Sequence, residues 1–315
     1  MKRLVIQFIA FIILATIAFQ PELNPFAIKS EDSYSQPSEP VLHKEEIYNK
    51  IKQKSQELEE PPQDAKIDNV WKKMPGLNGL KINIEKSYEK MSENGEFDQS
   101  LLIYEQVEPE VSLEDLPPSP IYRGHPDKQM VAFLINVAWG TDNIPSMLNT
   151  LKKHDVKANF FIEGKWASNN TKLVKMIQEE GHTIGNHAYN HPDMKRLSTA
   201  QNTEQIERTN DILEAITDEQ PKWFAPPSGS FNQQVVETAS QLEMETILWS
   251  VDTIDWQKPS TSVMVNRVMD NLHPGAMILM HPTNVVEQGL EELILNIQQK
   301  GYKIVSLEKL LSEKR

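Results

Sequence analysis

The sequence changes its pattern of apolar and polar positions near residue 129. From there to the carboxyl terminus, short apolar runs alternate with helix-length amphipathic runs, which is typical of a βα repeat. The apolar runs predict seven strands, at residues 130–137, 158–162, 182–186, 222–225, 245–250, 276–280 and 303–306. The amphipathic runs predict helices at residues 143–154, 170–180, 200–216, 232–242, 261–271 and 285–299. Such a repeat predicts a closed or nearly closed parallel barrel, with its functional residues at the carboxyl ends of the strands.

The amino-terminal segment has a different pattern. Lys2 and Arg3 precede an apolar run, Leu4 to Phe19, in which Gln7 is the strongly polar member. A basic region followed by an apolar region is typical of an export signal. We therefore interpret residues 1–19 as a signal peptide or an uncleaved membrane anchor, and expect the protein to be exported, either anchored to the cell membrane or extracellular in the cell wall.

The segment between the export signal and the repeat is rich in proline and charge. We interpret residues 20–69 as a tether, disordered where Pro, Ser and acidic residues dominate, that carries one solvent-exposed helix over His43 to Glu60. Residues 70–127 predict a small α+β module and a linker, because two strand-like runs flank a helix-like run within 70–112. The barrel domain is then residues 128–315.

Composition narrows the classes of partner and cofactor. The chain contains no cysteine, so a transition-metal site must use His, Asp or Glu. The formal net charge of −13 supplies no basic face for phosphates, so we expect no nucleic-acid partner.

Two histidines, His187 and His191, stand four residues apart behind the third predicted strand. On a helical turn, side chains at this spacing share a face, so two imidazoles could converge on one zinc ion. The same pair read alone also fits two surface histidines in a polar loop, because a metal site is defined by its full ligand set.

Unusual clusters follow most of the predicted strands, and together they resemble a known family. The clusters are Ala138-Trp139-Gly140-Thr141-Asp142, Asn186-His187 with His191-Pro192, Ala225-Pro226-Pro227-Ser228-Gly229, Asp252-Thr253-Ile254-Asp255-Trp256, and Leu279-Met280-His281. The second, fourth and fifth match the H-x-x-x-H, D-x-x-D-W and L-x-H motifs of the polysaccharide deacetylases of carbohydrate esterase family 4, the NodB homology domain. The third matches the R-x-P-x-G motif in part. The chain from about residue 128 to 315 thus resembles this family.

The resemblance implies a deformed (β/α)7 barrel, an α/β fold, that removes acetyl groups from N-acetyl sugars of peptidoglycan or chitooligosaccharide by metal-assisted hydrolysis. By carry-over, His187 and His191 would bind a divalent metal, zinc being the family's expected ion. His281 would be the general acid, supported by Asp255 or Asp252. Substrate-binding residues would be Pro227, Trp139, Trp256 and Leu279, with the Ser228 backbone N–H at the oxyanion.

The first motif departs from the family pattern. Asn136 and Val137 stand where the family has the catalytic base and a metal-binding aspartate, and neither can perform that role. Ala225 stands where an arginine orients the base. A buried arginine without its acid would be an unpaired charge, so these losses are coupled. Asp142 is the nearest carboxylate that could complete the metal shell, with Asp193 behind it.

Two functions from different classes remain open. One is a divergent hydrolase with impaired activity, favoured by the retained His281 and its carboxylate partner. The other is a non-catalytic glycan-binding or scaffold relative, favoured by the loss of base, ligand and arginine. The altered first motif resembles the sporulation-associated branch of the family, which implies a role in the spore cortex or cell wall.

Overall fold

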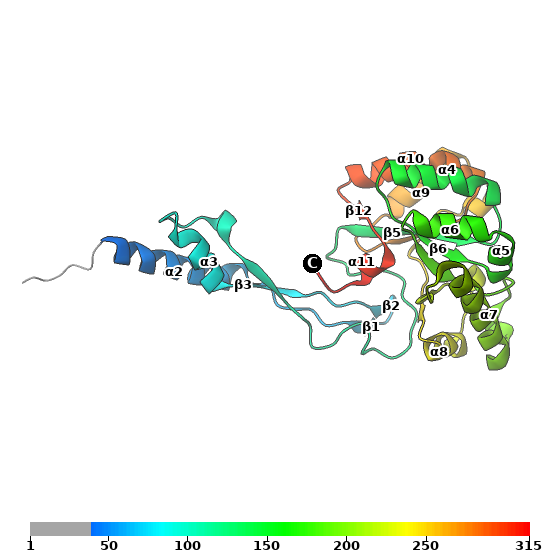
Figure 1. The fold of residues 1–315 in the computed structure, drawn as a ribbon, viewed down its shortest axis with the longest axis horizontal. Helices are drawn as coiled ribbons and strands as arrows, with labels where there is room; N and C mark the ends of the chain where they lie inside the picture. The colour runs from blue at the N-terminus through cyan, green and yellow to red at the C-terminus, as the bar shows by residue number, and fades with distance from the viewer. Residues whose placement is uncertain (1–38) are drawn as a thin grey trace, which may run out of the picture.

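The computed structural model describes residues 39–315, and side chains from residue 44 onward. Figure 1 shows an elongated molecule, with a small amino-terminal module at one end and a larger barrel at the other. The predicted export segment, residues 1–19, lies outside the described residues. Within the described part of the chain, no helix has the length and apolar character needed to cross a membrane.

The barrel is a curled parallel sheet in the strand order β10-β11-β5-β6-β7-β8-β9, with β12 paired to β5. Its strands are β5 (Met130–Val137), β6 (Asn159–Ile162), β7 (Thr183–Asn186), β8 (Trp223–Phe224), β9 (Glu245–Thr246), β10 (Val251–Asp252), β11 (Met277–Met280) and β12 (Lys303–Ile304). The pairings within this sheet are parallel. The predicted fold class, an α/β deformed (β/α)7 barrel, is confirmed.

The central strand β5 explains why the sequence forms this sheet. Its residues alternate between two buried surfaces, because successive side chains of a strand point to opposite faces. Val131, Phe133 and Ile135 pack in the cluster that the helices cover, whereas Ala132 and Leu134 pack in a second cluster with Phe161, Ile247 and Leu307. A strand buried on both faces is continuously apolar, which is the pattern that predicted it.

Most helices cover the outer face of the sheet, and one short helix packs against the second cluster on the other face. The helices are α4 (Ile144–Lys153), α5 (Gly164–Asn169), α6 (Thr171–Glu179), α7 (Thr199–Thr217), α8 (Gln233–Gln241), α9 (Thr261–Asn271), α10 (Asn284–Gln299) and α11 (Leu307–Leu311). Each helix predicted in the repeat is present within a few residues. The sequence analysis did not predict α5 or the short α11, whose Leu307, Leu310 and Leu311 pack in the second cluster.

One predicted strand, 245–250, is wrong in its extent. The chain forms β9 beside β8, bends, and then forms β10 beside β11. Between them, the Leu248 N–H donates to Ile121 O and the Ser250 N–H donates to Met277 O. Because of the bend, one segment pairs at both open edges of the sheet, which nearly closes the barrel. The bend also places residues 252–256 at the mouth of the barrel.

The amino-terminal module is built on α2 (Glu39–Leu58), α3 (Ile84–Ser92) and an antiparallel pair, β3 (Gly79–Ile82) and β4 (Tyr104–Val107). The prediction of a solvent-exposed helix in a tether is corrected, because α2 packs on α3. Ile47 and Ile51 of α2 are buried with Ile82, Met91 and Leu102 in a separate small core. The four-residue spacing of Ile47 and Ile51 gives the helix one narrow apolar stripe. Most of the neighbouring residues are charged or polar, so the sequence pattern predicted an exposed helix instead.

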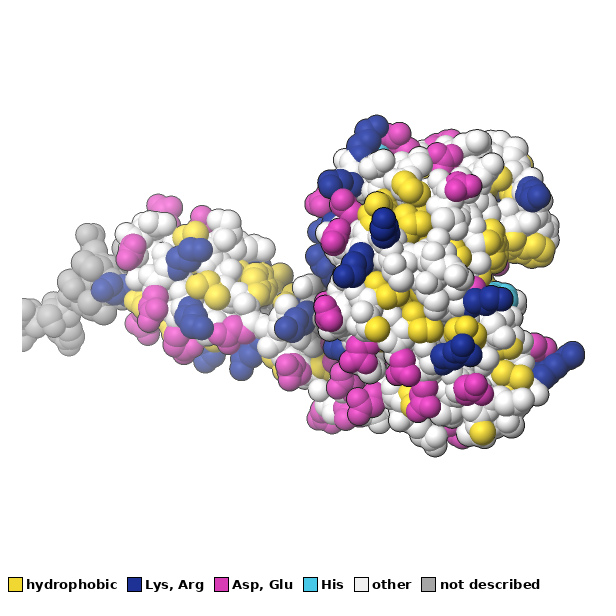
Figure 2. All heavy atoms as spheres, turned by 45° about the vertical axis from the view of Figure 1, so that its right-hand side comes forward, with side chains coloured by type: hydrophobic (Ala, Val, Ile, Leu, Met, Phe, Trp, Pro, Cys, Tyr) yellow, Lys and Arg dark blue, Asp and Glu magenta, His cyan; other side chains and the backbone are white. Residues whose placement is uncertain are grey.

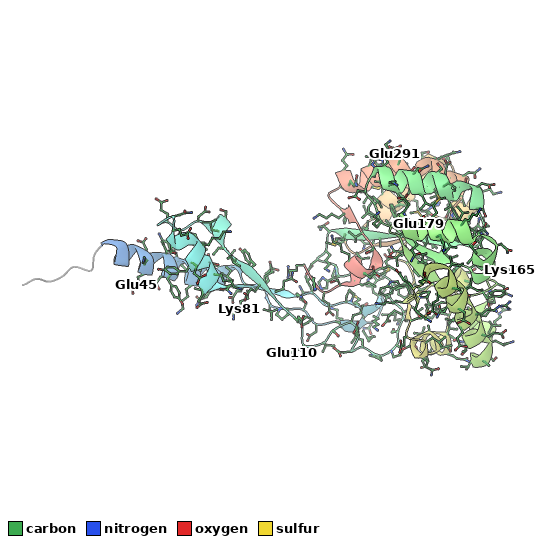
Figure 3. The ribbon with its side chains drawn as sticks, in the orientation of Figure 1. Glu45, Lys81, Glu110, Lys165, Glu179 and Glu291 are labelled. Atoms are coloured by element: carbon green, nitrogen blue, oxygen red, sulfur yellow. The ribbon has the colours of Figure 1, made fainter. Side chains whose placement is uncertain are left out.

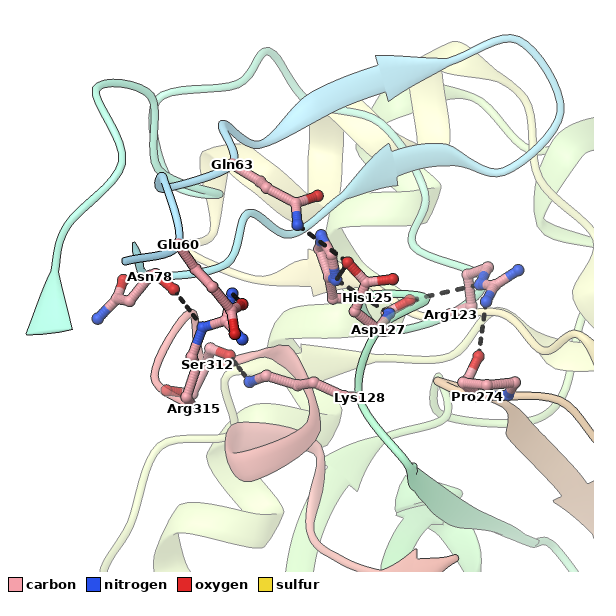
Figure 4. Close-up of polar contacts among 11 residues, drawn as sticks. Glu60, Gln63, Asn78, Arg123, His125, Asp127, Lys128, Pro274, Ser312 and Arg315 are labelled. Atoms are coloured by element: carbon pink, nitrogen blue, oxygen red, sulfur yellow. Dashed lines mark hydrogen bonds and ion pairs between the residues drawn. The ribbon is translucent and has the colours of Figure 1, made fainter. Parts of the chain in front are cut away.

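The module meets the barrel at the amino-terminal ends of its strands. A hairpin of β1 (Lys66–Asp68) and β2 (Lys72–Met74) carries Lys73, which is 2% exposed and pairs with Glu245 at the start of β9. Figure 4 shows the neighbouring polar contacts, in which Arg315 binds Asn78 O and Glu60, and Arg123 donates to Pro274 O just before β11. The opposite end of the barrel is therefore left uncovered by the module.

Candidate active site

The predicted site residues lie at the uncovered end of the barrel, where the parallel strands reach their carboxyl termini. Asn136 and Val137 end β5, His187 follows β7, and His281 follows β11. Lys165, in the first turn of α5 just after β6, is labelled in Figure 3 at the side of the barrel farthest from the module. In Figure 2 the surface is hollowed on this side between two lobes, and a histidine side chain shows at the edge of the hollow.

His187 and His191 have adjacent rings, with centroids 5.2 Å apart and planes at 71°. The prediction that a helical turn brings them together is wrong, because residues 187–191 form a loop. Ala188 and His191 instead adopt left-handed backbone angles, φ 59° and 57°, which fold the loop back on itself. Such angles are uncommon for residues other than glycine, so the fold of this loop constrains them.

The protonation of His187 is defined by its surroundings. Its Nδ1 lies 2.7 Å from Ala225 O, and a carbonyl oxygen only accepts, so Nδ1 carries the proton and Nε2 keeps its lone pair. Burial, and secondarily the charge of His191, lower the pKa of His187 to about 3. Burial also lowers the pKa of His191. Both imidazoles are therefore neutral near pH 7, which is the state that a metal ligand requires.

His281 and Asp255 form a second unit beside them. His281 Nδ1 donates to Asp255 Oδ1 at 3.0 Å, and the carboxylate, which is fully buried, also accepts from Thr253 Oγ1 at 2.7 Å and Thr283 Oγ1 at 2.8 Å. Burial by itself raises the pKa of Asp255, but these hydrogen bonds outweigh it, so the pKa lies below its usual value. Asp255 is therefore ionised and holds the imidazole by a charge-assisted bond.

Asp252, the other predicted partner of His281, is placed differently. It is half-buried, and one of its carboxylate oxygens accepts the Ile254 N–H at 2.8 Å. Burial raises the pKa of Asp252. Of the two carboxylates in this motif, the structure pairs Asp255 with His281 and uses Asp252 to shape the turn.

The predicted substrate-binding residues surround these histidines. Trp139 is 43% exposed and its ring stacks on His281, with centroids 5.0 Å apart and planes at 17°. Trp256, next to Asp255, is 55% exposed, whereas Leu279 on β11 is buried. Pro227 and Ser228 lie in the short helix η4 (Pro227–Gly229) after β8, where Ser228 has a left-handed φ of 53°. The mouth thus presents two exposed indoles: Trp139, which stacks on His281, and Trp256, which follows Asp255 in the chain.

The residues that replace the family's acids and arginine are buried. Asn136 is 4% exposed, and its Oδ1 has no hydrogen-bond partner. Val137 is buried in the core that the helices cover, and Ala225 packs in the second apolar cluster. An orphaned buried acceptor costs about 1–3 kcal/mol. Asn136 therefore carries a buried amide oxygen to which no other described residue donates a hydrogen bond.

The hypothesis that Asp142 or Asp193 completes a metal shell is not supported by the geometry. Asp142 is exposed in the turn η2 (Thr141–Asn143). Asp193 instead accepts from Ser230 Oγ and pairs with Arg196 at 2.9 Å. Among the side chains described, from residue 44 onward, no three His, Asp or Glu groups are arranged to hold one metal ion. The donor set is two neutral imidazoles, and it does not fit a zinc centre with three protein ligands.

The sequence analysis missed the residues that support the site. Thr253 and Thr283 bind both oxygens of Asp255, and Arg267 of α9 donates to Thr253 O at 2.9 Å. Glu163, which follows β6, is half-buried, and burial raises its pKa. Its N–H donates to Val137 O and the next N–H donates to Ala188 O, so it lies between the altered first motif and the histidine loop. No sequence motif marks Thr283 or Glu163, because contacts from other elements define their roles.

Comparison with known proteins agrees with this geometry. Residues 123–247 match the family model of polysaccharide deacetylases. A peptidoglycan-N-acetylglucosamine deacetylase of Bacillus cereus is 33% identical over 191 residues, which cover 59% of this chain and 70% of that protein. The chain therefore belongs to the polysaccharide deacetylases of carbohydrate esterase family 4.

Two further relatives match most of the chain. The uncharacterized protein YlxY of Bacillus subtilis is 48% identical over 316 residues, covering 100% of this chain and 99% of that protein. The crystal structure of BA3943 from Bacillus anthracis, described as a family 4 pseudoenzyme, superposes with a TM-score of 0.80 at 47% identity and covers 85% of this chain and 96% of its own. A mutant of BA3943 is described as having restored enzymatic activity.

Proposed function

We propose that this protein binds N-acetylated glycan of the cell wall at a deacetylase-type mouth and has lost most or all of the hydrolysis. The observation that carries the proposal is a site that retains only part of the family's catalytic residues. The His281–Asp255 unit is intact, whereas Asn136, Val137 and Ala225 replace the base, a metal ligand and the arginine of the family pattern, and no three His, Asp or Glu groups among the described residues are arranged to hold one ion. Similarity to BA3943, a pseudoenzyme, supports the loss of activity, and similarity to peptidoglycan deacetylases supports a glycan ligand.

We further propose that the protein acts outside the cytoplasm, at the cell membrane or in the wall, with a role in the spore cortex or cell wall. The basic residues followed by an apolar run at the amino terminus support export. A membrane-anchored barrel whose mouth points away from the module would present that mouth to the wall.

The test measures acetate release and glycan binding by the full chain. N-Acetylglucosamine oligomers and purified peptidoglycan serve as substrates. A positioned base contributes about 10²- to 10⁴-fold to catalysis, so we expect native turnover to be lower by at least that factor than in a restored variant. Asn136→Asp, Val137→Asp and Ala225→Arg together should restore acetate release more than any single change, because these residues act as a unit.

The control is His281→Ala in the restored variant, which should abolish acetate release while glycan binding persists. Robust native turnover that survives His281→Ala would contradict the proposal. A second candidate function, a slow deacetylase, is favoured by the intact His281–Asp255 unit. It predicts weak native acetate release that His281→Ala removes.

A further inference from the structure

Trp139 is one of two exposed tryptophans of the mouth that lie outside the metal, acid and base positions, and it is the one that stacks on His281. It belongs to the altered first motif, directly after the strand that carries Asn136 and Val137. Its indole is 43% exposed while it stacks on the His281 ring at 5.0 Å and 17°. A large aromatic that keeps a face open at the mouth of a barrel is the kind of group that binds ligands.

The turn that carries Trp139 is locked in place. Gly140 has φ 77° and lies against the turn after His281, so that a Cβ at this position would meet Pro282 O at 2.0 Å. Asn143 Nδ2 donates to the same Pro282 O at 2.9 Å. Trp166 Nε1 donates to Thr141 Oγ1 at 3.1 Å. These contacts tie the two turns together, and the stacking on His281 places the indole before a ligand binds, which lowers the ordering cost of binding.

The surface beneath the indole is equally fixed. His281 is held by the buried Asp255 carboxylate, which Thr253 and Thr283 hold in turn. Asp255 lies in the core and hydrogen-bonds His281, and the His281 ring stacks on Trp139, which reaches the surface. In this arrangement the imidazole supports the indole from below.

We propose that Trp139 is a stacking platform that holds one N-acetylhexosamine ring of the wall glycan by its C–H face, without a metal ion. The inference rests on the proposed function and names how that site holds its ligand. A pyranose ring presents C–H groups on one face, which pack on an indole, and hydroxyls around its edge, which remain in water.

The experiment titrates the full chain with chitotetraose, the tetramer of N-acetylglucosamine, by calorimetry and tryptophan fluorescence, with and without EDTA. We expect Trp139→Leu, which keeps apolar volume but removes the aromatic face, to weaken binding about threefold to tenfold. Trp139→Phe should retain most of the affinity. EDTA should leave the native affinity within about twofold, since the platform needs no ion.

Tyr104→Ala is the matched control, because Tyr104 is 44% exposed on β4 of the module, away from the mouth. It should bind as the native chain does. Native affinity in Trp139→Leu, or binding that EDTA abolishes and zinc restores, would overturn the platform while leaving glycan binding as the function. No binding of chitotetraose or peptidoglycan by the native chain would instead overturn the proposed function.

Discussion

At the residue scale, the site keeps the hydrogen-bond partners that orient His187 and His281. It has lost the base, the metal-binding aspartate and the arginine of the family pattern. His187 keeps its carbonyl partner and a free Nε2, and His281 keeps its carboxylate. Asn136 keeps the position of an acid without the charge. Because an unpaired buried charge costs more than an unpaired buried amide, losing the acid, the ligand and the arginine together costs the fold less than losing only some of them.

Zinc binding provides a direct test of the ligand loss. Two neutral imidazoles lack the negative charge that offsets Zn²⁺, so we expect weak binding by the native chain. Val137→Asp should strengthen zinc affinity by placing a carboxylate at the position that the family uses. Calorimetric titration with zinc decides the point, and Val137→Asn serves as the uncharged control. An unchanged affinity in Val137→Asp would contradict the assignment of this position.

The threonine support of Asp255 is the second test at this scale. Thr253→Val keeps the shape of a side chain that is fully buried but removes a donor to an ionised carboxylate. Loss of such a bond should lower the free energy of unfolding by about 1–3 kcal/mol. Urea denaturation measures the change. Thr253→Ser restores the hydroxyl and should recover most of the loss, whereas equal destabilisation by Ser and Val would mean that the methyl group matters instead.

At the element scale, the strands and most helices of the barrel could be predicted, because each buries an apolar face with its own period. The bend between β9 and β10 could not, since it depends on which edges of the sheet are open. The histidine loop could not either. Its conformation needs left-handed angles at Ala188 and His191, and neither residue signals such an angle. The sequence therefore predicted that His187, His191 and the His281–Asp255 pair follow strand ends, but it wrongly offered Asp142 as a ligand and did not predict the loop that joins the histidines.

A substitution at Gly140 tests the contact between the turn after β5 and the turn after β11. Gly140→Ala introduces a methyl group that would meet Pro282 O at 2.0 Å and places alanine at φ 77°. The turns after β5 and β11 must then separate, which should destabilise the protein by more than about 1 kcal/mol and move the indole of Trp139 off His281. Thermal unfolding and the ring-current shift of the His281 protons in NMR report the two effects. Gly95→Ala, at a positive φ with open space around it, isolates the cost of the backbone angle alone.

At the scale of the whole molecule, the module and the mouth occupy opposite ends of the barrel. The ion pair of buried Lys73 with half-buried Glu245 anchors the hairpin at the start of β9, and the same segment ends at Asp252. The α2 helix belongs to the module rather than to a free tether, and only its tertiary contacts with α3 reveal this. The module therefore contacts the barrel at the end opposite to the mouth and leaves the mouth uncovered.

The pH dependence of stability follows from buried imidazoles. His182, at the amino end of β7, is 6% exposed, and its Nδ1 accepts the Ala158 N–H, so its ring is held neutral. Burial, with a contribution from Lys157, lowers the pKa of His182 to about 4. The pKa in the unfolded chain is about 6.5. Between these values the unfolded chain binds more protons, so the stability that is fully present above pH 6.5 is lost as the pH falls toward 4.

We therefore expect the free energy of unfolding to decrease between pH 7 and pH 5, with His182 contributing about 2 kcal/mol of the change. His187, whose pKa is also lowered by burial, acts in the same direction. Urea denaturation at both pH values measures the total. His182→Asn places a side-chain acceptor near the Ala158 N–H without a titrating group, so the difference between pH 7 and pH 5 should shrink by the His182 share. An equal pH dependence in the native chain and in His182→Asn would show that protonation of His182 does not cause the loss of unfolding free energy at acidic pH.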